Sequence, residues 1–142
     1  MNILDNIKGS PIRSHRVYCG PTIGWIEAPI FQDKVLTTAD APIYRVQPWD
    51  SVLLVSMQVL TSLSIYLPSS RRWYNKDYGS WSIYIKDIHG LLTPTAGILI
   101  QVEPDPGGPA ESIDGIDSYT MITPYSSIML RPRSSLNGWY SL

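Results

Sequence analysis

The sequence predicts an all-β protein. Apolar and polar residues alternate with a period of two, the apolar runs are rich in β-branched and aromatic residues, and Gly- or Pro-containing turns separate them. In the segment 81–86, Trp81, Ile83 and Ile85 share one face of a strand and polar neighbours occupy the other. Many short strands spaced by roughly 8–12 residues favour an antiparallel β-sandwich or a jelly-roll-like barrel.

The remaining strands follow from the same pattern. They are expected at 63–67, 97–102, 118–122, 127–131 and 138–141, with weaker candidates at 15–19, 22–27, 34–37 and 43–47. Residues 52–63 fit either one amphipathic helix or two strands broken near residues 56–58. The Val, Ser and Thr content and the flanking Pro48 and Pro68 favour the strands.

The alternation also predicts a core and a division of the chain. Prolines at positions 11, 21, 29 and 42 would interrupt a sheet interior, because proline lacks the backbone donor. We therefore expect an extended N-terminal arm or peripheral β layer at 1–46 and the main β module at 47–142. The predicted module core consists of Ile83, Ile85, Ile98, Ile100, Ile128 and Leu130.

Composition limits the classes of function. The 142 residues carry a formal net charge of −1, and 16% of them are charged, against about 25% in an average soluble domain. A chain with so little net charge has no long-range electrostatic field to attract nucleic acid or an acidic membrane surface, so neither partner is expected. The single cysteine cannot form an intramolecular disulfide, and the aromatic residues are mostly Tyr and Trp, which suit subunit interfaces.

The ends and apolar runs of the sequence suggest neither export nor membrane insertion. Asp5 and Lys8 interrupt what would be the apolar segment of a signal peptide. The longest apolar run, residues 52–60, is much shorter than the roughly 20 residues that a membrane-spanning helix needs. We expect synthesis in the cytoplasm and no membrane partner.

No sequence motif for phosphate, dinucleotide or zinc binding, and no nucleophile elbow, is found. Glu111, Asp114 and Asp117 could bind Ca²⁺ or serve a glycosidase, but a polar turn at Asp114-Gly115 is the favoured interpretation. Glu103 and Asp105 flank Pro104 in what we interpret as a solvated loop. We therefore expect no catalytic residue, no metal site and no cofactor.

The two histidines and the cysteine do not suggest catalysis either. His15 and Cys19 would lie about 13 Å apart in a strand, which is too far for a nucleophile pair. Cys19 is interpreted as a small buried or interfacial thiol, and His89 as a turn residue.

One short segment combines cations with aromatic rings, the side chains that stack on sugars or bases. It is a possible surface recognition patch, and a solvated loop or a subunit contact is the favoured alternative. Its residues are Arg71, Arg72, Trp73 and Tyr74.

From Asp50 onward, the order of segments resembles a β-structured module of tailed-bacteriophage virion proteins, found in head-decoration proteins, head fibres and tail fibres. The resemblance rests on a strand that ends in Leu67-Pro68, a strand that runs into Lys86-Asp87 and a Gly turn, an Ile113-Asp114-Gly115 turn, and a closing strand with Asn137-Gly138-Trp139. The run Val52-Leu53-Leu54-Val55 precedes these segments. Between them lie Gly97-Ile98-Leu99-Ile100, Tyr119-Thr120-Met121-Ile122 and Ser127-Ile128-Met129-Leu130-Arg131.

The resemblance implies a non-enzymatic virion part, commonly trimeric, that docks on the major capsid protein or on another virion protein. A capsid decoration or cement protein on the outer surface of the head is the first expectation, because the chain is short for a fibre. A head-fibre or tail-fibre module that binds host-surface glycans is the alternative. Residues 1–46 lie outside the resemblance.

Overall fold

A computed structural model describes residues 14–18, 21, 25–29, 32–47, 49–57, 62–71, 82–133, 135 and 137–142. The all-β prediction is confirmed, since almost every regular element in these residues is a strand. A short 3-10 helix, η2 at Thr38–Asp40, begins with a capping box in which Thr37 and Asp40 bond to each other's backbone.

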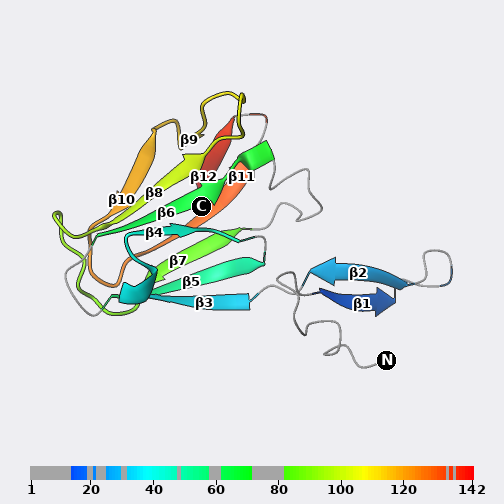
Figure 1. Ribbon diagram of the computed structural model, residues 1–142, viewed down its shortest axis with the longest axis horizontal. Coiled ribbons are helices and arrows are strands. Elements are labelled where there is room, and N and C mark those ends of the chain that lie inside the picture. The colour runs from blue at the N-terminus through cyan, green and yellow to red at the C-terminus, as the bar shows by residue number, and fades with distance from the viewer. Residues whose placement is uncertain are drawn as a thin grey trace.

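The strands form three separate sheets (Figure 1). β1 and β2 pair only with each other among the described strands, as an antiparallel hairpin. A four-stranded sheet has the order β10-β8-β6-β4, and a six-stranded sheet has the order β3-β5-β7-β11-β12-β9. The bounds are β1 Ser14–Tyr18, β2 Trp25–Pro29, β3 Gln32–Thr37, β4 Ile43–Arg45, β5 Asp50–Ser56, β6 Leu63–Pro68, β7 Ile83–Asp87, β8 Ile98–Glu103, β9 Ser112–Ile113, β10 Ser118–Met121, β11 Ser127–Arg133 and β12 Gly138–Ser141.

The expectation of antiparallel sheets is wrong, because both large sheets are mixed. From β3 to β8, consecutive strands alternate between the two sheets. The chain therefore returns to each sheet in the same direction, and β3, β5 and β7 pair in parallel, as do β4, β6 and β8. Antiparallel pairing enters where β11 joins β7 and β12, and where β10 joins β8.

The two large sheets share one hydrophobic core. Inward residues of β6 and β8, such as Ile65 and Ile100, belong to the same buried cluster as Leu53 of β5 and Ile85 of β7. Trp139 of β12 is also buried, and its Nε1–H donates to the carbonyl oxygen of Pro68 on β6 at 3.0 Å, which links one sheet to the other. The predicted core residues are all buried: Ile83, Ile85, Ile98, Ile100, Ile128 and Leu130.

The predicted N-terminal segment, residues 1–46, contributes edge strands to both large sheets. β3 ends the six-stranded sheet and β4 ends the four-stranded one. Leu36 of β3 and Val46, just after β4, are members of the core cluster. The segment 52–63 contains the end of β5 and the start of β6, so the strand interpretation is confirmed over the helical one.

Candidate functional site

Of the predicted recognition patch, only Arg71 lies in the part of the chain that the structure describes. Arg71 is exposed, and its Nη2 donates to the Asn137 side-chain oxygen at 2.8 Å. Arg72, Trp73 and Tyr74 lie outside the described residues. The bond to Asn137 ties Arg71 to the turn before β12.

The candidate acidic group does not form one site. Glu111 is buried, and its Oε1 accepts hydrogen bonds from the backbone N–H of Ser70, at 2.8 Å, and from the Ser70 hydroxyl. Asp114 instead accepts from the backbone N–H of Ser141 at 3.0 Å and from its hydroxyl. Asp117 is exposed. The first two carboxylates thus hold separate parts of the backbone together.

The turn at Asp114 follows the predicted chemistry. Asp114 has a φ of 50° and Gly115 a φ of 82°, and Ile113 and Ile116 bond to each other across the turn at 2.8 and 2.9 Å. Such left-handed conformations favour Asp, Asn and Gly. The sequence Asp-Gly therefore serves the local backbone.

The remaining candidates from the sequence are Glu103, Asp105, His89, His15 and Cys19. Glu103 forms an ion pair of 3.0 Å with Arg45, and both side chains are at least half exposed, so solvent screens it strongly. Asp105 lies in a loop closed by a 2.8 Å bond from the Gly108 N–H to its carbonyl oxygen. His89 is exposed. His15 belongs to β1, of which the backbone alone is described, and Cys19 lies outside the described residues.

Sequence reasoning missed the structural role of Asp87. This carboxylate is 2% exposed and accepts hydrogen bonds from the backbone N–H groups of His89, Gly90 and Tyr125. Aspartate commonly bonds to the backbone two residues further on in a turn, so the Asp-x-x-Gly spacing was a usable signal for the first two bonds. The bond to Tyr125 joins the loop after β7 to the loop before β11, which the sequence could not show.

A second buried carboxylate lies between β4 and β5. Asp50 Oδ2 accepts from the Tyr44 hydroxyl at 2.7 Å and from the Gln47 N–H at 2.8 Å. No described group donates to its Oδ1. Burial raises the pKa of the Asp50 carboxyl, although the Gln47 N–H, the Tyr44 hydroxyl and the charge of Lys34 act in the opposite direction. Burial and the neighbouring carboxylates raise the pKa of Tyr44.

The outward face of the six-stranded sheet carries several apolar side chains, with Asp33 beside Val52 and Lys86 beside Leu54. In the register of the sheet, Val35 lies beside Leu54, Val52 lies beside Tyr84, and Tyr84 lies beside Met129. Val35 is 48% exposed and Met129 38% exposed, and the other three are partly exposed. We call Val35, Val52, Leu54 and Tyr84 the outer apolar face.

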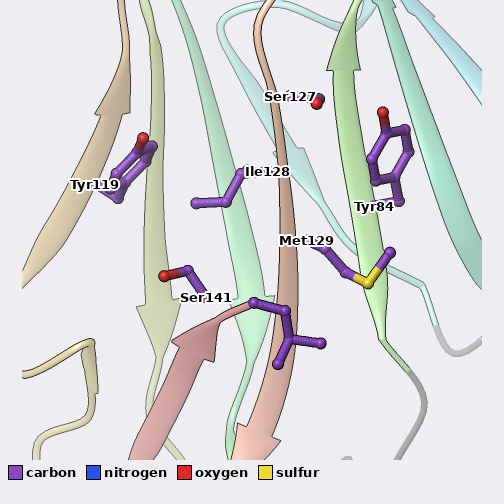
Figure 2. Close-up of a pocket in the computed structure, with 7 residues that line it drawn as sticks. Tyr84, Tyr119, Ser127, Ile128, Met129 and Ser141 are labelled. Atoms are coloured by element: carbon purple, nitrogen blue, oxygen red, sulfur yellow. The ribbon is translucent and has the colours of Figure 1, made fainter.

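A hollow of about 550 Å³ is lined by residues from strands of both large sheets (Figure 2). In Figure 2, Tyr84 and Met129 lie on one side of β11, and Tyr119 of β10 lies on the other. Ser127, Ile128, Ser141 and Leu142 complete the lining. We call this feature the β10–β11 hollow. Its lining offers hydroxyl groups and apolar surface, and it contains no charged side chain.

Within the described ranges, no three or more His, Cys, Asp or Glu side chains are grouped so that they could hold a metal ion. No helix among the same residues is long and apolar enough to cross a membrane. No family model matches the sequence, and no curated protein matches it.

Proposed function

We propose that this chain is a non-enzymatic structural subunit of a tailed-bacteriophage particle, and that it acts as a decoration or cement protein on the outer surface of the head. The observation that carries the proposal is the outer apolar face. Parallel strands, such as β3, β5 and β7, are usually covered on both faces of their sheet. Here Val35, Leu54, Val52 and Tyr84 occupy neighbouring positions on the outward side.

The low charge supports the same proposal. With 16% charged residues, the chain has few groups to keep a large sheet face solvated. Covering apolar surface contributes about 25 cal/mol per Å² before the costs of ordering, so many docked copies together can reinforce a shell. The major capsid protein, or another virion protein, is the proposed partner.

The surroundings of three carboxylates, Asp87, Glu111 and Asp114, favour a structural role over hydrolysis. Asp87 and Glu111 both accept backbone N–H bonds that fasten loops, and Asp114 fastens the last strand. A glycosidase that works through a carboxylate pair needs at least one carboxyl group free to exchange protons with its substrate. These three are engaged in holding the backbone.

The finer architecture is part of the proposal. We propose that the two large sheets constitute a β-sandwich, that residues 1–46 provide an arm or peripheral layer that reaches neighbouring subunits, and that the protein is a homotrimer. The shared core supports the sandwich, and the edge positions of β3 and β4 support a peripheral layer.

A docking experiment tests the proposed role. Purified protein is added to phage heads emptied of DNA, and its binding and the heat stability of the shells are measured. Val35→Asp, which places a charge on the outer apolar face, should abolish both effects, while Asp117→Ala, at an exposed turn, should retain them. Equal binding by wild type and Val35→Asp would refute docking through this face.

A glycan array addresses the alternative of a fibre module. Specific sugar binding by the wild-type protein that is lost in Trp73→Ala would favour recognition of the host surface over a cement role. The cement proposal predicts no sugar binding that depends on Trp73.

A further inference from the structure

Tyr125 occupies a turn position that normally belongs to glycine or asparagine. The turn at 123–126 is closed by a 3.2 Å hydrogen bond from the Ser126 N–H to the Thr123 carbonyl oxygen, and Pro124 and Tyr125 are its central residues. Tyr125 has a φ of 60°. A turn with proline second and a positive φ at the third residue has the features of type II, which favours Gly or Asn there. A tyrosine at this position is a conformational outlier.

Two side chains of β7 hold Tyr125 in this conformation. The Asp87 carboxylate accepts from the Tyr125 N–H at 2.9 Å, and the Lys86 ammonium donates to the Tyr125 carbonyl oxygen. Asp87 is buried, and its own N–H donates to the Ser126 carbonyl oxygen at 3.0 Å. Strained residues persist only where their surroundings determine them, and they gather at binding and catalytic sites. The outlier is therefore a fixed part of this loop and directs attention to its side chain.

The Tyr125 ring is held in place and is nevertheless largely exposed. It lies against Gly90, where a Cβ atom would come within 2.3 Å of a ring carbon. The absence of a side chain at Gly90 leaves the room that the ring takes. Even so, 60% of Tyr125 is exposed, so burial of the ring does not explain a tyrosine in the strained position. Asparagine would suit the backbone better, which points to a use for the ring outside the folded chain.

The turn at 123–126 borders the outer apolar face. Lys86, which bonds to the Tyr125 carbonyl oxygen, lies beside Leu54 of that face in the register of the sheet. Ser127, two residues after Tyr125, lies beside Lys86. Ile88, which follows β7, is also exposed. An exposed aromatic ring that is fixed beside apolar residues has the properties of an anchor in a protein interface, where tyrosine is enriched.

We propose that Tyr125 is a preorganised anchor residue, whose ring enters an apolar cleft of the shell protein when the outer apolar face docks. This inference rests on the proposed function and names a contact residue for it. Because the ring is already held in place, docking does not have to order this side chain. A protein is favoured over a sugar, since a site for a polar ligand needs hydrogen-bonding groups placed around the ring, and the Lys86 and Asp87 side chains already bond to the loop.

The test separates binding from stability in the full-length protein. Tyr125→Asn removes the ring and supplies a residue that tolerates positive φ. This variant should leave the urea midpoint of unfolding unchanged or raise it, and it should weaken docking on emptied heads by about tenfold or more, equivalent to ~1.4 kcal/mol. Tyr125→Phe retains the ring and should dock as the wild type does. Ile116→Asn is the matched control and should also dock normally, because Ile116 is 52% exposed in a different turn, after β9.

The outcomes distinguish this inference from the proposed function. If the wild-type protein does not bind emptied heads, both fail. Wild-type docking that Tyr125→Asn retains overturns the inference alone, and so does a clear fall in the urea midpoint of this variant, which would give the ring a structural role. Equal losses of docking in Tyr125→Phe and Tyr125→Asn would contradict an anchor that acts through its ring. Release of the docked protein by soluble host-surface glycan would assign the ring to sugar recognition and overturn the inference as well.

Discussion

The Asp87 carboxylate accepts a hydrogen bond of 2.9 Å from the backbone N–H of Tyr125, 38 residues further along the chain. The same carboxylate closes its own turn through the N–H groups of His89 and Gly90. Lys86, its neighbour in β7, donates to the Tyr125 carbonyl oxygen. Adjacent residues of one strand thus hold both polar groups of a single distant peptide residue, and so join the loop after β7 to the loop before β11.

Replacing Asp87 should therefore cost more than replacing an ordinary turn residue. Asp87→Ala leaves three N–H groups without their acceptor, and we expect a loss of about 2–4 kcal/mol in the free energy of unfolding. The variant Asp87→Asn keeps one side-chain oxygen, so its free energy of unfolding should lie between those of the wild type and Asp87→Ala. Urea denaturation measures the effect, and Asp117→Ala, at an exposed position, should change stability by less than about 0.5 kcal/mol. A similar small change for Asp87→Ala would show that the bonds to this carboxylate contribute little.

Gly90 is required for its conformation and for the space it leaves. Its φ is +80°, and a Cβ atom there would lie 2.3 Å from the Tyr125 ring. Gly107 has a φ of +75° with nothing within 4 Å of such an atom, so it isolates the backbone effect. Gly107→Ala should cost about 1 kcal/mol, and Gly90→Ala should cost more, because the exposed Tyr125 ring must move away from the new Cβ atom.

Removal of the Tyr125 ring tests the origin of that excess. In the double variant Gly90→Ala/Tyr125→Ala, the additional cost should disappear when stability is compared with Tyr125→Ala alone. If the excess persists without the ring, the crowding explanation is incorrect.

The raised pKa of Asp50 makes stability depend on pH. When a carboxyl has a higher pKa in the folded than in the unfolded protein, the folded state binds its proton more tightly. The buried charge therefore opposes folding at pH values above the pKa of the folded state. This opposition disappears as pH falls through that pKa toward the ordinary value of 3.8 in the unfolded chain. Lys34, Tyr44 and Asp40 are the neighbouring titratable groups.

Asp50→Asn provides the measurement. Asparagine retains an oxygen that can accept from Tyr44 and Gln47 but does not titrate. Urea unfolding of both proteins between neutral and mildly acidic pH should show the wild type gaining stability relative to Asp50→Asn as pH falls. A constant difference, or a relative loss by the wild type, would contradict the direction of the Asp50 shift.

Much of the strand content follows from the sequence, because alternation is local. The clear alternation at 81–86 and the Leu-Ser-Ile-Tyr-Leu run beginning at Leu63 correspond to β7 and β6. Alternation divides a strand into two faces, but it does not identify the neighbouring strands. The parallel pairing of β5 with β7 arises from the passage of the chain through the other sheet, and β9, with two residues, is too short to have a period.

The candidate surfaces depended still more on tertiary structure. Val35, Leu54 and Tyr84 are ordinary members of three separate runs, and only the register of the sheet makes them neighbours. Tyr119 and Met129 come from different sheets and meet only at the β10–β11 hollow. Glu111 and Asp114 were the acidic residues considered from the sequence for Ca²⁺ binding or catalysis. Both accept hydrogen bonds from the backbone instead.

The central claim is that the chain is a component of the outer surface of a phage head. Particles purified from the source of this sequence can be labelled with an antibody against the full-length protein and examined by electron microscopy, and the copy number per particle can be measured by quantitative mass spectrometry. We predict labelling distributed over intact heads, with many copies per particle. Absence from purified particles, or labelling confined to the tails, would contradict the account.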